Sequence, residues 1–175
     1  MTMVSRSIAA ALLAASLGLG ACGGAGERGT TRGGSAGSRH ALRMRMTAMD
    51  GGEIDLLRYR GRVVVLHLFD TDSAAAQLDA EQLTALARRE QKRVKVIGIC
   101  LDAEGYPMAA AWRRALGVGY LIALGDRDLV VGHSPLGKLH VVPTTVLLDR
   151  NGYVVHRIER QLRPGELAEM VDDLF

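Results

Sequence analysis

The clearest structural pattern in this chain is Val63-Val-Val-Leu-His-Leu-Phe-Asp-Thr-Asp-Ser-Ala-Ala-Ala76. Its first seven residues are almost continuously apolar and rich in β-branched side chains, which is typical of a strand buried on both faces. The polar exception is His67. Thr71, Asp72 and Ser73 all favour helix N-caps, and apolar residues then recur at helical spacing as far as Arg89. The stretch therefore predicts a buried strand that turns directly into a helix.

The rest of the chain extends this unit on both sides. Val94–Leu101 is a second buried strand, and the order strand, helix, strand predicts a parallel crossover. Upstream, Leu42–Thr47 and Glu53–Leu56 predict a hairpin around Asp50-Gly51-Gly52. Downstream we expect a helix over Tyr106–Leu116, a short strand over Tyr120–Leu124 and a loop or weak helix over Asp126–Leu139. A hairpin should follow, in which Thr144–Asp149 pairs with Tyr153–Ile158 across the turn Asn151-Gly152. Pro164 should open a terminal helix.

Side-chain patterns also predict which residues face the core. In the first helix we expect Leu78, Leu83 and Leu86 to be the apolar face, and Asp79 with Glu81 to complement the helix dipole. Met108 and Trp112 predict one packing face of the second helix, and Met44 and Met46 share a strand face that we expect to fill core.

The charge pattern argues against a nucleic-acid-binding domain. The formal net charge of the chain is +3, but four of the 22 basic residues and one of the 19 acidic residues precede residue 41. Residues 41–175 therefore carry 18 basic and 18 acidic side chains, and a nucleic-acid footprint would need a basic surplus.

The N-terminus has the pattern of a secretory leader. Arg6 precedes the apolar run Ile8–Leu13, which is too short to cross a membrane, and Leu19-Gly20-Ala21-Cys22 looks like a bacterial lipobox. We expect residues 1–21 to be a lipoprotein signal peptide and Cys22 to carry lipid, anchoring the protein to a membrane. An ordinary secretory signal with an unrelated cysteine is the alternative.

The segment after Cys22 is predicted to be a tether. Residues 22–40 are rich in Gly, Ser, Thr and Arg and too poor in apolar residues to form a core, so we expect a lipidated flexible linker. Residue 23 is Gly and not the Asp that in lipoproteins of this type often signals inner-membrane retention, which slightly favours the outer membrane. Residues 41–175 then form one domain.

Three segments, in order, resemble the TlpA/ResA-type thioredoxin-like (redoxin) proteins of the bacterial envelope: Val63–Leu86, Val142-Pro143-Thr144-Thr145 and Leu147–Gly152. The resemblance implies an α/β thioredoxin-like fold, with a central mixed sheet flanked by helices and an N-terminal β-hairpin extension. In that family the strand ends in Phe-Trp-Ala-Thr-Trp before Cys-x-x-Cys. Here the segment reads Leu68-Phe-Asp-Thr-Asp72, and Ser73 and Ala76 stand at the two cysteine positions.

The degenerate turn leaves a groove as the expected site. The resemblance implies that Pro143 is a cis-proline beside the turn, the alternative being a trans proline at a strand start. We expect binding of a protein partner or extended peptide, with no metal and no cofactor, by these residues: Asp72, Ser73, Val142, Pro143 and Thr144. We expect Ser73 to cap the helix and not to act as a nucleophile, because the sequence places no general base next to it.

Two other candidate sites stay open. Asp70 and Asp72 with His67 or His140 could bind a metal, although solvated turn carboxylates are commoner. Besides Cys22 the only cysteine is Cys100, in an apolar strand where cysteine behaves as a small hydrophobe, and the following Asp102 opposes a lowered pKa.

The sequence thus predicts a membrane-anchored, periplasm-facing thioredoxin-fold protein that is redox-inactive and acts as a binding or scaffold module of the bacterial envelope. The alternative is a thiol-disulfide oxidoreductase or peroxiredoxin-like enzyme that uses Cys100 or a partner's thiol.

Overall fold

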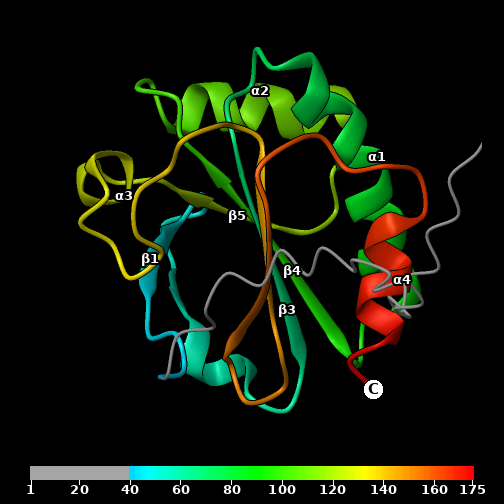
Figure 1. The fold of residues 1–175 in the computed structure, drawn as a ribbon. Coiled ribbons are helices and arrows are strands. Elements are labelled where there is room, and N and C mark those ends of the chain that lie inside the picture. Colours follow the sequence, from blue (N-terminus) through cyan, green and yellow to red (C-terminus); the bar gives the residue numbers. More distant parts are fainter. Residues whose placement is uncertain (1–39) are drawn as a thin grey trace, which may run out of the picture. The chain divides into compact units, whose positions relative to one another are not determined.

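A computed structural model describes residues 40–175 of the protein (Figure 1). The predicted leader, the lipidation site Cys22 and the linker except for His40 lie outside the described residues. The elements are, in chain order, β1 (Arg45–Ala48), β2 (Glu53–Asp55), the 3-10 turn η1 (Leu56–Tyr59), β3 (Val63–Phe69), α1 (Ala74–Arg89), β4 (Val94–Cys100), α2 (Tyr106–Leu116), β5 (Leu121–Leu124), α3 (Arg127–Val131), β6 (Thr144–Leu148), β7 (Val154–Ile158) and α4 (Glu166–Asp172).

The seven strands form one mixed sheet in the order β2-β1-β5-β4-β3-β6-β7. The central strands β3, β4 and β5 are parallel, as the predicted crossover requires, whereas β6 runs antiparallel to β3. The hairpin β1–β2 extends one edge because β1 pairs antiparallel with β5. The structure therefore confirms the predicted α/β architecture and its N-terminal hairpin extension.

Both faces of β3 are covered, which explains its unbroken apolar sequence. Val63, Val65 and Phe69 pack on one side of the sheet with residues of α1, α2 and α4. Val64, Leu66 and Leu68 pack on the other side with the hairpin and α3. Figure 1 shows α4 alongside α1, with α3 apart from both. We call these two sides the α1 face and the α3 face.

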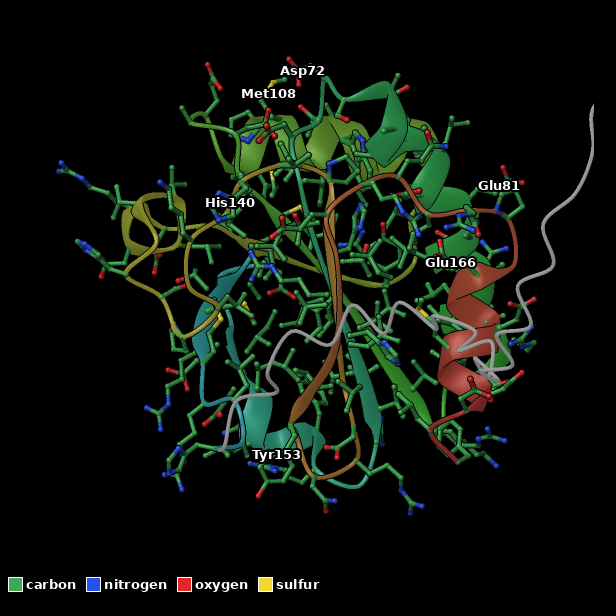
Figure 2. The ribbon with its side chains drawn as sticks, in the orientation of Figure 1. Asp72, Glu81, Met108, His140, Tyr153 and Glu166 are labelled. Carbon is green, nitrogen blue, oxygen red and sulfur yellow. The ribbon has the colours of Figure 1, made fainter. Side chains whose placement is uncertain are left out.

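Three predicted positions on the first two helices were wrong. The buried stripe of α1 is Ala76, Asp79, Ala80, Leu83 and Leu86, so Asp79 faces the core and Leu78 is 57% exposed. A period of 3.6 residues explains this, because position 78 falls outside the arc that 76, 80 and 83 define. In α2, Ala109 and Trp112 are buried but Met108, in the first turn, is 38% exposed. Figure 2 shows Met108 at the same end of the sheet as Asp72.

Smaller features follow the sequence, with shifts at the ends of elements: the first strand is Arg45–Ala48 and not Leu42–Thr47. Met44 and Met46 are buried in the core of the α3 face as expected. The terminal helix begins at Glu166 with Gly165 as its N-cap, two residues after the predicted Pro164, because Gly165 adopts a left-handed conformation (φ 81°) that interrupts the helix there. Within residues 40–175, no helix is both long enough and apolar enough to cross a bilayer.

Candidate functional site

The turn between β3 and α1 is held by a helix cap. Ser73 has extended backbone angles, and its Oγ accepts a hydrogen bond from the amide of Ala76 at 3.3 Å. Such a cap satisfies one of the amide donors that a helix start leaves free. The two positions that carry cysteines in the resembled family thus hold a capping serine and the buried Ala76. The predicted capping role of Ser73 is confirmed.

Asp102, in the loop after β4, ties this turn to the neighbouring strand. Its Oδ2 accepts from the amide of Thr71 at 3.0 Å, and its Oδ1 accepts from Thr71 Oγ1 at 2.9 Å. The Cys100 thiol donates to the same Oδ2 at 3.0 Å. Asp102 therefore accepts three hydrogen bonds from two adjacent strand ends, and it fixes the backbone of the turn.

Cys100 is a buried and weakly acidic thiol. It lies at the carboxyl end of β4 opposite Phe69 and is 1% exposed. Burial raises its pKa to about 12, and the hydrogen bond to Asp102 adds to the increase. A thiolate is the reactive form of cysteine, so little of it forms here at neutral pH. The sequence-based expectation that Asp102 opposes a lowered pKa is confirmed.

The segment before β6 faces the turn. The Val142–Pro143 peptide bond is cis, and Pro143 and Thr144 are buried. The Thr144 hydroxyl donates to the carbonyl of Val141. Val141 is exposed and Val142 half-buried, so these two residues, and not Thr144, are open to a binding partner.

A pocket of about 320 Å³ joins the turn to this segment. We call it the Asp70 pocket; its lining is Asp70 from the turn, Val141 and Val142 from the cis-proline segment, and Leu101, Val130, Leu139 and His140. Of the predicted binding residues, only Val142 lines it. Asp72 is exposed on the same turn, and Ser73 is engaged as the cap. The structure thus places apolar side chains around a single carboxylate.

The carboxylates at this end affect one another. Partial burial raises the pKa of Asp70, and the negative charges of Asp102 and Asp72 raise it further. A cation or a hydrogen-bond donor placed beside Asp70 would relieve both effects. The pocket is therefore suited to a positively charged or donor group flanked by apolar surface.

His67 is separated from the metal site considered above. It is fully buried on the α1 face, and its Nδ1 lies 3.0 Å from Thr145 Oγ1. Burial lowers its pKa to about 3, so the ring is neutral. Leu101 and Leu139 of the Asp70 pocket pack on the α3 face, on the other side of the sheet. No three His, Cys, Asp or Glu side chains in the described part of the chain are grouped to hold a metal ion.

Asp79 is a buried polar residue whose role the sequence did not reveal. Its Oδ1 accepts from the amide of Leu162 at 3.0 Å, which ties α1 to the loop before α4. Burial raises its pKa to about 6, and the negative charge of Glu166 adds to the increase. Helical spacing in the sequence could have predicted the burial of Asp79, because this residue falls on the same stripe as Ala76, Ala80 and Leu83.

Comparison with known proteins identifies relatives of the whole domain. Residues 35–174 match the family described as Redoxin. Among curated proteins no match was found.

Solved structures show the same fold. A DsbF homologue from Corynebacterium diphtheriae superimposes with a TM-score of 0.69 at 20% identity, covering 77% of this chain and 85% of that one. A secreted thiol-disulfide isomerase from Corynebacterium glutamicum gives a TM-score of 0.69 at 18% identity, over 77% and 84% of the two chains. A putative protein disulfide isomerase from Bacteroides thetaiotaomicron gives 0.62 at 24% identity, over 76% and 84%. The predicted thioredoxin-like fold is confirmed.

Proposed function

This chain belongs to the redoxin family, and we propose that it is a binding module of the cell envelope whose Asp70 pocket holds an extended segment of a partner protein. The family's fold is related to that of thiol-disulfide oxidoreductases. In this chain the turn and the cis-proline segment adjoin one pocket, while the two positions for a reactive dithiol are occupied by Ser73 and Ala76.

The observation that carries the proposal is the juxtaposition of the turn and the cis-proline segment around a pocket. Val141 is 48% exposed and Val130 is 55% exposed, although both are apolar and both line the pocket. Exposed apolar side chains beside a binding edge favour contact with another protein. The partly buried Asp70 favours a segment that presents Lys, Arg or an amide donor between apolar residues.

The envelope location and the anchor form the second part of the proposal. The leader pattern ending at Cys22 supports export and lipidation, with the domain facing the periplasm and the outer membrane slightly favoured. The corynebacterial isomerase of the same fold is described as secreted. Labelling with a radioactive fatty acid tests the anchor: label should enter the protein and be lost in Cys22→Ser. Label that persists in Cys22→Ser would refute lipidation at this residue.

Site-specific photo-crosslinking in cells tests the binding surface. A photoreactive amino acid at Val141 should capture a partner, and Asp70→Asn in the same protein should reduce the yield. The matched control is Tyr153, which is also exposed but lies at the opposite end of the sheet (Figure 2). Equal crosslinking from positions 141 and 153, or a yield at 141 that ignores Asp70→Asn, would exclude the pocket as the binding site.

A thiol oxidoreductase that uses Cys100 is the second candidate, and the position of the thiol favours it. Cys100 ends β4 beside the turn, and Asp102, which accepts from the thiol, also holds the backbone of that turn. Attack on a partner disulfide would form a mixed disulfide with Cys100 and release the partner's second sulfur as a thiolate, with the thiol proton moving to Asp102. The burial of Cys100 opposes this step. Dithiol-dependent reduction of insulin above a Cys100→Ser control would establish the enzyme and contradict the sequence-based expectation that the protein is redox-inactive.

A further inference from the structure

A second pocket, of about 310 Å³, lies at the amino end of β4, the end opposite Cys100. It opens between the C-terminal half of α1 and the residues that lead into β5. We call it the basic pocket, and its polar lining residues are Arg62, Arg88, Lys95, Thr84, Gln91 and Tyr120. No carboxylate lines it, so its charge is positive.

The two arginines of the basic pocket, Arg62 and Arg88, have no ion-pair partner among residues 40–175. Lys95 borders the pocket, but its side chain points to the α3 face, where its Nζ lies 5.4 Å from the centre of the Tyr59 ring. The carboxylate nearest in sequence, Glu90, is already engaged by Arg89 at 3.0 Å and by Arg93 at 3.6 Å. Burial lowers the pKa of Lys95, and the positive charge of Arg62 lowers it further. An anion bound to Arg62 would offset part of this repulsion.

Two hydroxyl groups of the lining are buried without a hydrogen-bond partner. Tyr120 is 4% exposed, and neither its hydroxyl nor that of Thr84 has a partner in the described structure. Leaving a buried hydroxyl unpaired is unfavourable, so such groups mark a place where a ligand or ordered water completes the site. Both hydroxyls can donate to an oxyanion.

We propose that the basic pocket binds a phosphate group, held by Arg62 and Arg88 with the hydroxyls of Thr84 and Tyr120. Guanidinium groups match the oxygen geometry of phosphate with paired donors. The volume leaves room for a phosphate ester as well as the free ion. A free phosphate compound and the phosphate of a lipid headgroup share this chemistry, and the experiment below separates them.

Arg88 could instead serve only to stabilise the end of α1, and in that case the pocket would not bind phosphate. Arg88 lies in the last turn of α1, where a cation is favoured by the helix dipole. If that were its whole role, phosphate would interact no better than chloride. The binding experiment therefore decides between the two.

The test is calorimetric titration of the detergent-purified protein with inorganic phosphate, at an ionic strength held constant with chloride. We expect saturable binding to one site, weakened roughly tenfold or more in Arg88→Gln and in Tyr120→Phe, since each removes a donor to a charged group. Arg114→Gln, which changes an exposed arginine on α2 outside the pocket, should bind as the wild type does. Absence of saturable binding, or equal affinity in Arg88→Gln and Arg114→Gln, would overturn the proposal.

A parallel titration uses glycerophosphoglycerol, the water-soluble headgroup of phosphatidylglycerol. Tighter binding of this diester than of inorganic phosphate, lost in Arg88→Gln, assigns the site to lipid headgroups. Tighter binding of inorganic phosphate, lost in the same variant, assigns it to free phosphate compounds. If both compounds bind but neither responds to Arg88→Gln, the basic pocket is not the phosphate site.

Discussion

Thr71 is joined to Asp102 by two hydrogen bonds, from its amide to Oδ2 at 3.0 Å and from its hydroxyl to Oδ1 at 2.9 Å. The pair links the loop after β3 to the loop after β4. A turn that has no disulfide is thereby anchored by a carboxylate, which also accepts from the thiol of Cys100. The position of Asp70 relative to Val142 depends on this anchor, because Asp70 directly precedes Thr71.

Replacing Asp102 should destabilise the domain. Asp102→Ala removes three hydrogen bonds and leaves the buried Thr71 hydroxyl unpaired, so we expect a loss of about 2–4 kcal/mol in the free energy of unfolding. Urea denaturation measures it. Asp72→Ala is the control, because this exposed carboxylate lies on the same turn, and a change within about 0.5 kcal/mol is expected. Equal effects of the two substitutions would show that Asp102 does not anchor the turn.

Cys100 should react slowly with alkylating agents. With a pKa raised to about 12, its rate with iodoacetamide should still be increasing at pH 10, where an ordinary thiol has reached its plateau. Asp102→Asn should increase the rate modestly, because burial is the larger cause of the raised pKa and persists in the variant. Mass spectrometry of timed samples gives both rates. A wild-type plateau below pH 9 would contradict the assignment and favour the oxidoreductase.

Local patterns predicted the elements because their determinants lie close together in the chain. The bounds expected for β3 and α2, Val63–Phe69 and Tyr106–Leu116, are those observed. The Ser73 cap was likewise predictable, since its acceptor and donor are three residues apart. Where periodicity was judged by apolar residues alone, as for Leu78, the face was wrong because the buried stripe of α1 includes the polar Asp79.

The contacts that define the site could not be predicted from local sequence patterns. Thr71 and Asp102 are 31 residues apart, and Asp79 and Leu162 are 83 apart, so no local pattern connects them. The groove was expected from the resemblance with Asp72 and Ser73 as its polar residues, and Asp70 was not among them. Only the packing of the cis-proline segment against the turn showed that Asp70, and not Ser73, lines the pocket beside Val142.

Gly98 should not tolerate a side chain, because two aromatic rings cover it. A Cβ at this position in β4 would lie 3.1 Å from Phe69 Cε1 and 3.1 Å from Tyr120 Cε2. Phe69 is itself stacked on Trp112, so its ring has little freedom to move. We expect Gly98→Ala to destabilise the protein by about 1–3 kcal/mol in thermal or urea unfolding. The control is Gly119→Ala, which meets nothing within 4 Å, and a similar loss there would exclude crowding as the cause.

Asp79 should make stability depend on pH. Its pKa is raised from 3.8 to about 6 in the folded state, so the fold favours the protonated carboxyl. That stabilisation is fully present below about pH 4 and is lost as the pH increases through about 6. Asp79→Asn keeps an oxygen acceptor for Leu162 and does not ionise. At pH 8 it should therefore be more stable than the wild type by about 1–3 kcal/mol, a difference that shrinks at pH 4.5.

Paired urea denaturations at pH 4.5 and pH 8 measure this difference. The groups facing Asp79 across the loop, Glu166 and Arg160, form an ion pair at 2.6 Å, and Arg160 lowers the pKa of Glu166 to about 2, so the pair stays ionised over this range. Tyr120, whose raised pKa lies above the range, stays neutral. The control is Glu81→Gln, which replaces an exposed carboxylate on the same helix (Figure 2) and should show no pH-dependent gain in stability. A gain that is equal at both pH values would mean that Asp79 is not the titrating group.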